Sequence, residues 1–192
     1  HEFQHGVSFK RMSVTSLKQV HKLFPDTIIA NATGLGLQYD GGYDPDSYKI
    51  RGQTLLIRPP ATFRPNKTVT HQGKDGKWTF YIPRPLNGGV ILGGTKQIGD
   101  EYDGVRESDT QELIERGKKL YPELFHNGEG EIHNVNVGFR PARKDGGRVE
   151  IERITCCTII HAYGAGGMGY ELSFGVGEKV AELLAGIRSS KL

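Results

Sequence analysis

The chain has 192 residues, of which 36% are hydrophobic and 24% are charged, and its formal net charge is +3 at pH 7. A chain of this length can bury the core of one ordinary domain without a metal ion or disulfide bonds. The positive charge is mild and dispersed, and no apolar run reaches the length of a membrane span. We therefore expect neither nucleic acid nor a membrane as a partner.

The two cysteines, Cys156 and Cys157, are neighbours in the sequence. Neighbouring cysteines cannot form a disulfide of the usual unstrained geometry, and this pair lacks the spacing of metal ligands. We expect no metal site and a reducing compartment. The 27 glycines are more informative, because they gather at 34–42, 86–99 and 164–177. Glycines cluster where a backbone turns sharply or contacts a ligand.

The first predicted elements are a helix and a buried strand. Apolar residues recur with helical spacing over 14–24, with Ser13 as the N-cap and Pro25 after the last turn. Residues 27–32 form a short apolar run that breaks at Thr33-Gly34-Leu35-Gly36. This pattern is typical of a parallel strand that ends at the carboxyl edge of a sheet, where ligands often bind.

The middle of the chain has the pattern of an antiparallel sheet. Polar turns separate short strands, which we predict at 52–57, 77–83 and 89–94. A helix follows over 108–121, with Ser108 and Gln111 as a capping box and Pro122 directly after it.

The last third of the chain contains strands and one helix. We predict strands at 132–139, 148–154 and 158–161, the first two joined across a turn at 144–147. The final helix covers 172–187. Its predicted inner face consists of Val176, Val180, Leu183, Leu184 and Ile187. The predicted fold is therefore mixed α/β.

A glycine-rich segment, residues 164–169, joins the last strand to the final helix. Its backbone N–H groups and the helix dipole would present partial positive charge to a ligand. The alternative is a loop that starts the helix without binding anything. Four glycines within these six positions favour a ligand, because glycine allows close approach.

Two further residues could recognise a carboxylate. Arg140 ends an apolar strand, and its planar guanidinium matches a carboxylate with two parallel hydrogen bonds. The alternative is an internal ion pair between Arg140 and a glutamate. Tyr81 could place a hydroxyl donor on a pocket wall, although a tyrosine in a strand is more often part of a core.

Seven short motifs follow one another along the chain. They are Asn31-Ala32-Thr33-Gly34, Arg51-Gly52-Gln53, Tyr81-Ile82-Pro83-Arg84-Pro85, Gly93-Gly94-Thr95, Gly138-Phe139-Arg140-Pro141-Ala142-Arg143, Arg148-Val149-Glu150 and His161-Ala162-Tyr163-Gly164. In this order they resemble the D-amino-acid oxidases, especially the fungal ones. The resemblance runs over essentially the whole chain.

The resemblance implies that this chain is the C-terminal part of a longer, two-domain FAD-dependent oxidase. Such oxidases open with a dinucleotide-binding βαβ unit that carries Gly-x-Gly-x-x-Gly, a motif that does not occur here. We expect 1–50 and 146–189 in a Rossmann-like FAD-binding domain and 51–145 in a substrate-binding domain with a mostly antiparallel sheet. The amino-terminal half would be a second chain or fragment. The connection 152–159 is shorter than in fungal relatives, so a surface excursion is expected to be missing there.

Carried over by position, the resemblance assigns two groups of residues. Arg140 and Tyr81 would bind the substrate α-carboxylate, and the carbonyl of Gly167 would accept a hydrogen bond from the substrate amino group. The residues expected to contact FAD are Val14, Thr33, Gly34, Gly166, Gly167, Met168, Gly169, Tyr170 and Glu171. No residue is expected to act as an acid or base, because hydride leaves the substrate Cα for the flavin.

The implied reaction is oxidative deamination of a D-amino acid by dioxygen, which yields a 2-oxo acid, ammonia and hydrogen peroxide. Lys96 departs from the pattern, because several yeast D-amino-acid oxidases have an aromatic residue there and D-aspartate oxidases have an arginine. A cation at this position could pair with the side chain of an acidic D-amino acid. The alternative is a solvated lysine at the end of a strand.

The last three residues, Ser190-Lys191-Leu192, match the C-terminal signal read by the peroxisomal import receptor. We therefore expect a peroxisomal protein, in a compartment that tolerates hydrogen peroxide. A homodimer is a further expectation. A hypothesis of another class is a non-catalytic interaction module, which would expose apolar surface where absent strands would pair.

Overall fold

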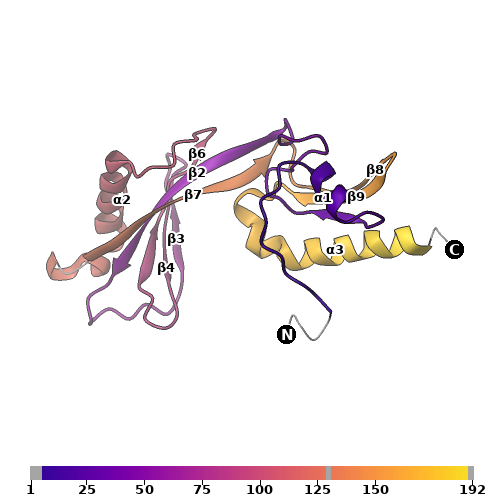
Figure 1. Cartoon of the computed structure of the whole chain (residues 1–192). Coiled ribbons are helices and arrows are strands. Elements are labelled where there is room, and N and C mark those ends of the chain that lie inside the picture. The colour runs from indigo at the N-terminus through magenta and orange to yellow at the C-terminus, as the bar shows by residue number, and fades with distance from the viewer. Residues whose placement is uncertain (1–5, 129–130, 190–192) are drawn as a thin grey trace. The chain divides into compact units, whose positions relative to one another are not determined.

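The structure, a computed structural model, describes residues 6–128 and 131–189 (Figure 1). It contains two units: unit 1 is His1–Ser47 with Pro141–Leu192, and unit 2 is Tyr48–Arg140. Sequence analysis places the corresponding transitions at 50/51 and 145/146. Among the described residues, no helix is both long and apolar enough to cross a membrane.

Unit 1 is built on a three-stranded sheet with the order β1-β9-β8. Its strands are β1 (Ile29–Asn31), β8 (Arg148–Ile154) and β9 (Cys157–Tyr163). β1 pairs with β9 in parallel, which confirms the parallel strand predicted from the apolar run at 27–32. β8 pairs with β9 in an antiparallel hairpin. The long helix α3 (Gly169–Ser189) contacts β8 and β9, and runs beside this sheet in Figure 1.

The helix α1 (Leu17–Leu23) begins later than the sequence pattern predicts. The predicted N-cap, Ser13, is wrong: the N-cap is Ser16, whose Oγ accepts a hydrogen bond from the Gln19 N–H at 3.2 Å. Serine is equally suitable at both positions, and only the later one is placed to meet a free N–H. The helix ends at Leu23 with Phe24 as its C-cap, directly before Pro25 as predicted.

The inner face of α3 is the one that the sequence predicts. Val176, Val180, Leu183 and Leu184 are half-buried and Ile187 is buried, whereas most other described positions of the helix are exposed. The helix begins at Gly169, three residues before its predicted start. Two aromatic side chains in its first two turns, Tyr170 and Phe174, are 100% and 86% exposed.

Unit 2 contains a six-stranded sheet with the order β3-β4-β5-β2-β6, and β7 pairs with β2. The strands are β2 (Ser47–Arg58), β3 (Val69–Gln72), β4 (Trp78–Pro83), β5 (Val90–Gly93), β6 (Gln97–Ile98) and β7 (Glu131–Arg143). The predicted antiparallel arrangement is confirmed for β2, β4 and β5. The sequence does not predict β3 or β6, because both are short and lie largely in polar sequence. The turn at 144–147 does follow β7, but β7 pairs with β2 while β8 pairs with β9.

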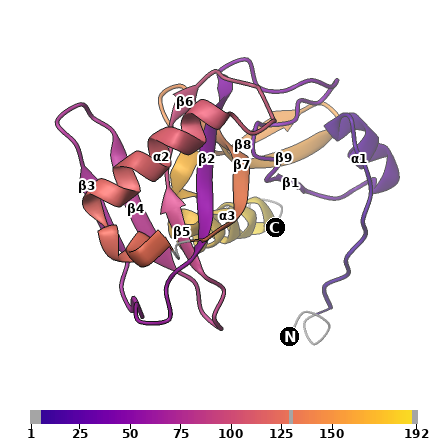
Figure 2. The ribbon, with the colours of Figure 1, turned by 90° about the vertical axis from the view of Figure 1, so that its left-hand side faces the viewer.

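The helix α2 (Glu107–Leu120) covers one face of this sheet, as Figure 2 shows. A short 3-10 helix, η2 (Pro122–Gly128), follows it. Between them and the sheet lies an apolar core of Leu55, Ile57, Tyr81, Val90, Leu92, Leu113, Tyr121 and Leu124. Together the two units confirm the predicted mixed α/β fold.

The predicted capping box of α2 is wrong. Ser108 lies inside the first turn, and Gln111 donates a hydrogen bond to Glu107 instead. The N-cap is Arg106, whose side chain makes no capping hydrogen bond. Its backbone N–H is bound by the side-chain oxygen of Gln53 at 3.0 Å, so strand β2 anchors the start of α2.

A buried hydrogen-bonded chain fixes β1 to β9 in unit 1. The amide nitrogen of Asn31 donates to the Leu37 carbonyl at 3.0 Å and contacts His161 Nδ1 at 3.1 Å. This arrangement makes Nδ1 the acceptor and leaves the ring proton on Nε2, which donates to Glu152 at 2.7 Å. Burial lowers the pKa of His161, and the hydrogen bond to Glu152 offsets part of that effect.

This histidine predicts a pH-dependent stability of unit 1. The unfolded chain binds a proton near the ordinary pKa of 6.5, while the folded chain resists protonation, so the stability is present above that pH and is lost as pH falls through the lower folded pKa. We expect amide protons of β9 to exchange faster, after correction for intrinsic rates, at about pH 5.5 than at about pH 7.5. The variant His161→Gln should show a smaller difference between the two conditions. An unchanged difference in that variant would contradict the assignment to His161.

Candidate functional site

The guanidinium of Arg140 lies directly on the backbone of Gly52 in β2. A Cβ atom placed on Gly52 would be 2.8 Å from Arg140 Nη2 and 2.9 Å from Cζ, so a larger residue would displace the guanidinium. Arg140 Nη1 also donates to the Thr95 carbonyl at 3.4 Å. These two contacts fix the position of the positively charged Arg140 guanidinium near the end of β7.

Arg140 has no internal anion among the described residues of unit 2. No carboxylate there lies within 4.0 Å of its guanidinium, and the weak bond to Thr95 is its one hydrogen bond. No glutamate among the described residues of unit 2 therefore forms the internal ion pair that was the alternative. A half-buried guanidinium that meets one carbonyl retains the capacity to bind a carboxylate with its planar fork.

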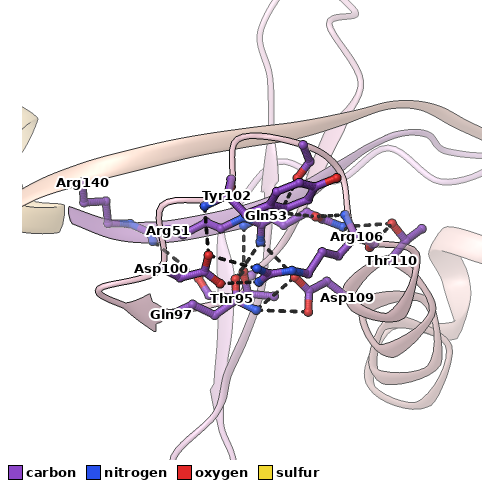
Figure 3. A network of polar contacts seen from close by, with 12 residues as sticks. Arg51, Gln53, Thr95, Gln97, Asp100, Tyr102, Arg106, Asp109, Thr110 and Arg140 are labelled. Carbon is purple, nitrogen blue, oxygen red and sulfur yellow. Dashed lines mark hydrogen bonds and ion pairs between the residues drawn. The ribbon is translucent and has the colours of Figure 1, made fainter.

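On the other side of β2 lies a buried polar network, shown in Figure 3. At its centre is Arg51, whose side chain is fully buried and whose five N–H donors are all used. The acceptors are the carbonyls of Tyr102 and Gly104 and the side chains of Gln53, Gln97 and Asp109, at 2.6–3.0 Å. Among the described residues, the one carboxylate that contacts Arg51 is that of Asp109 in α2.

The register of the sheet places Tyr81 on the face that carries this network and the core. Leu92 pairs with both Tyr81 and Leu55, so these three side chains share a face with Arg51 and Gln53. Tyr81 is 5% exposed, makes edge contacts with Phe63 and Tyr121, and has a pKa raised by burial. Arg140 lies on Gly52, which belongs to the opposite face. The structure therefore does not bring Tyr81 to Arg140.

Phe80 occupies the face that Tyr81 was predicted to occupy. It pairs with Gly93, and a Cβ atom placed on Gly93 would be 2.6 Å from its ring carbon Cε2. Its ring therefore covers the two glycines that precede Thr95. Sequence reasoning missed Phe80, although strand alternation implies that Phe80 and Tyr81 point to opposite faces.

Lys96 lies between two residues of the site. The carbonyl of Thr95 accepts from Arg140, and the side chain of Gln97 belongs to the Arg51 network. Lys96 itself is exposed. Its position in the sequence thus places a cation one residue from the carbonyl that Arg140 contacts.

The two glycine turns of unit 1 meet at one edge of its sheet. The Gly164 N–H donates to the Gly34 carbonyl at 3.0 Å, and both residues have positive φ, 82° and 76°. They follow β9 and β1, so the predicted carboxyl edge is real. The hydroxyl of Thr33 is used within its own turn, donating to Asn31 at 2.7 Å and accepting from the Leu37 N–H at 2.8 Å.

The later part of the glycine-rich segment leaves open space above its backbone. Among the described residues, a Cβ atom on Gly169 would meet nothing within 4 Å and one on Gly166 would meet Ala142 at 3.8 Å, whereas one on Gly164 would be 2.7 Å from Arg143 Cβ. The segment leads through a 3-10 turn (Gly166–Met168) into α3, whose first N–H groups have no acceptor within the helix. This open surface beside free N–H groups would admit a flat ring such as the isoalloxazine of FAD. Of the other predicted FAD contacts, Met168, Tyr170 and Glu171 are exposed, and Val14 packs against the cluster that contains Leu17.

An acidic residue supports the start of this segment. Asp44 accepts hydrogen bonds from Arg143 at 2.9 Å and from Tyr163 at 2.7 Å. Although burial alone would raise the pKa of Asp44, these bonds and one from the Asp46 N–H hold it at about 2. The charged carboxylate thus fixes Tyr163, the residue before Gly164, across the neutral pH range.

The variant Gly52→Ala is expected to weaken carboxylate binding. The new methyl group would occupy the position of the Arg140 guanidinium, which must then move away from the Thr95 carbonyl. A misplaced binding group costs up to about 10²-fold, and we expect roughly tenfold weaker binding of propionate, a carboxylate without an amino group. Titration of the flavin spectrum would measure this affinity. Gly99→Ala, at a positive-φ turn of the same unit with open space around it, serves as the control.

Comparison with known proteins gives consistent results at the levels of sequence and fold. The chain is 39% identical to a D-amino-acid oxidase of Schizosaccharomyces pombe over 179 residues, which cover 89% of this chain and 50% of that protein. It is 40% identical to a D-aspartate oxidase of Talaromyces thermophilus over 181 residues, 91% of this chain and 46% of the other. The chain thus spans about half the length of these curated relatives.

Solved structures with a similar fold include two bacterial oxidases. Glycine oxidase from Bacillus cereus has a TM-score of 0.62 at 18% identity, covering 73% of this chain and 36% of that one. Iminodiacetate oxidase from Chelativorans has a TM-score of 0.60 at 19% identity, covering 85% and 43%. Residues 3–183 match the family described as FAD dependent oxidoreductase. With this match over nearly its whole length, the chain belongs to the FAD dependent oxidoreductase family.

Proposed function

We propose that this chain is part of an oxidase that deaminates D-amino acids to 2-oxo acids, with release of ammonia and hydrogen peroxide. The observation that carries the proposal is Arg140, a half-buried guanidinium that has no carboxylate partner among the described residues of unit 2. A D-amino-acid oxidase and a D-aspartate oxidase are 39% and 40% identical to this chain over 179 and 181 aligned residues.

The chain's own residues would bind and orient the substrate. Arg140, positioned by its contact with Gly52, would bind the α-carboxylate. The Gly167 carbonyl would accept a hydrogen bond from the amino group. The glycine turns at 34 and 164–169 would hold FAD, which supplies the two-electron oxidation of the substrate. The backbone N–H groups at the start of α3 would stabilise negative charge placed next to them. No side chain needs to act as an acid or base at the substrate Cα.

The experiment uses the chain together with its amino-terminal half and added FAD. We expect a yellow protein whose visible absorption bleaches without oxygen on addition of D-alanine or D-aspartate, and returns on admission of air with formation of hydrogen peroxide. L-Alanine serves as the control and should cause no bleaching. A flavoprotein that no D-amino acid reduces would overturn the proposal. A colourless protein would support the alternative of a non-catalytic module.

A second candidate is oxidation of acidic D-amino acids. Lys96 favours it, because this cation lies next to the Thr95 carbonyl that Arg140 contacts. We expect Lys96→Ala to raise the KM for D-aspartate by up to about fivefold, which corresponds to the free energy of one exposed charge pair, while the KM for D-alanine changes little. Lys67→Ala, at an exposed lysine of the same unit, controls for the change in net charge. An equal loss on both substrates, or no loss on either, would contradict a role of Lys96 in specificity.

The amino-terminal half is the proposed partner of this chain, and a homodimer is proposed for the assembled protein. The chain spans about half of its curated relatives, and apolar side chains at the start of α3 are uncovered: Leu172 is 42% exposed and Phe174 86%. Tyr170 lies one helical turn before Phe174 and is also exposed, and exposed apolar side chains that lie together mark surfaces suited to burial against another polypeptide. Co-purification of the two halves in a fixed ratio, followed by a mass measurement of the complex, would test both proposals.

Peroxisomal localisation is proposed from the Ser190-Lys191-Leu192 tripeptide, which lies outside the described residues. Import by the receptor requires this tripeptide at the free carboxyl end of the protein. A fluorescent protein that ends in the last residues of this chain should enter peroxisomes, and deletion of Leu192 should leave it in the cytosol.

A further inference from the structure

The three residues at 51–53 of β2 present two different surfaces. Arg51 and Gln53 point toward α2 and are both fully buried, while Gly52 between them faces the other way and lies under Arg140. In Figure 3, Arg140 approaches from the side away from helix α2. Gly52, which the guanidinium of Arg140 contacts, is therefore fixed in position by its two neighbours in β2, whose side chains are anchored on the opposite face.

Gln53 uses every hydrogen-bonding group of its side chain. The oxygen accepts from Arg51 and from the Arg106 N–H, both at 3.0 Å. The nitrogen donates to the Arg106 carbonyl and to Thr110 Oγ1, both at 2.9 Å. A side chain with four satisfied bonds and no exposed surface has one conformation, so its backbone position is fixed as well.

The backbone of Gln53 in turn fixes Thr95. The Gln53 N–H donates to Thr95 Oγ1 at 2.8 Å, and the Thr95 N–H donates to the Gln53 carbonyl at 3.1 Å. Thr95 is therefore held at its N–H and at its hydroxyl, which leaves its carbonyl aimed at Arg140. The Gln53 side chain is thus connected to both supports of Arg140, the Gly52 backbone and the Thr95 carbonyl.

We infer that Gln53 is a positioning residue for carboxylate recognition, acting through Gly52 and Thr95 on the guanidinium of Arg140. This inference rests on the proposed function of Arg140. A group held in advance in its binding geometry spends less free energy on ordering when the ligand arrives. The buried network behind β2 therefore serves substrate affinity as well as the stability of α2.

The test is a double-mutant cycle with Gln53→Met and Arg140→Leu, in the chain assembled with its amino-terminal half and FAD. Methionine keeps the length of glutamine and removes its hydrogen bonds. We expect Gln53→Met to weaken propionate binding about tenfold and to change kcat much less. In the Arg140→Leu background the same substitution should have almost no further effect, because Gln53 acts on the ligand only through the guanidinium of Arg140.

The cycle separates the possible outcomes. If Arg140→Leu alone leaves propionate binding unchanged, the proposed function is overturned. If Arg140→Leu weakens binding and Gln53→Met does not, or if the two effects simply add, the positioning role is overturned and the proposed function stands. A purely structural effect is represented by Leu124→Ala, which destabilises the same core without touching the network and should leave propionate affinity unchanged.

A milder variant covers the case in which Gln53→Met does not fold. Thr110→Val removes one of the two acceptors of the Gln53 nitrogen and keeps the shape of the side chain. It should weaken propionate binding about twofold to threefold, and again only when Arg140 is present. Unchanged affinity in a folded Thr110→Val protein would count against the inference.

Discussion

Replacement of Arg140 by leucine is expected to abolish tight binding of carboxylate substrates. The guanidinium has no carboxylate partner among the described residues of unit 2, so its removal leaves no internal charge unpaired and should not unfold that unit. The carboxylate of the proposed substrate, in contrast, would lose a charged and directional partner. Loss of such a contact costs about 3 kcal/mol, which corresponds to roughly 10²-fold in the dissociation constant. Titration of the flavin spectrum with propionate and the KM for D-alanine would both report it.

Two matched variants sharpen this prediction. Arg84→Leu removes the same charge from an exposed position at the turn between β4 and β5, and should change neither value appreciably. Arg140→Lys keeps the charge and loses the planar fork, so it should recover only part of the affinity. An Arg140→Leu enzyme with a normal KM for D-alanine would contradict the assignment of Arg140.

The elements that sequence predicts well are those whose signals are local. The inner face of α3 follows from the spacing of Val176, Val180 and Ile187, and the parallel strand β1 follows from an apolar run that ends in glycine. Helix starts are less predictable, because their caps can come from elsewhere in the chain. The N–H of Arg106, the N-cap of α2, is bound by Gln53, a residue 53 positions earlier, and no pattern near Arg106 could reveal that.

The sequence predicts Tyr81 at a binding pocket, and the structure places it in the apolar core. This difference shows how much a shift of one residue changes in a strand. Neighbouring side chains in β4 point to opposite faces, so a one-residue change of assignment exchanges a core position for one on the Arg140 face. The sequence Phe80-Tyr81 contains two aromatic residues, and a hydroxyl makes the second a natural choice for a binding role. The pairing of Tyr81 with Leu92 and of Phe80 with Gly93 decides the matter, and this register depends on long-range contacts.

The role of Arg51 is likewise visible only in the folded chain. Its motif, Arg51-Gly52-Gln53, is one of the seven motifs that resemble D-amino-acid oxidases. The motif does not show that the Arg51 side chain lies on the face of β2 opposite to Arg140. The distinction between Arg51 and Arg140 depends on their partners. Among the described residues, Arg51 has Asp109 and four further acceptors, whereas Arg140 has one carbonyl in unit 2. An arginine whose N–H donors are all used within the protein supports the structure, and one with free N–H donors is available to a ligand.

The variant Asp109→Leu should therefore be strongly destabilising. It removes the one carboxylate that contacts Arg51 and leaves a fully buried guanidinium charge without compensation. Breaking a buried pair from one side costs about 3–5 kcal/mol. The single tryptophan, Trp78, lies in β4 of the same unit, so its fluorescence during urea unfolding would report the loss.

The double variant Arg51→Met with Asp109→Leu separates the charge from the packing. Replacing both partners of a buried pair by apolar residues of similar size is often neutral, because no unpaired charge remains. Here the carbonyls of Tyr102 and Gly104 would lose their donor, so recovery should be partial: the double variant should be more stable than Asp109→Leu and less stable than the parent. A double variant less stable than Asp109→Leu would show that the hydrogen bonds of Arg51, rather than compensation of its charge, hold strand β2 against helix α2.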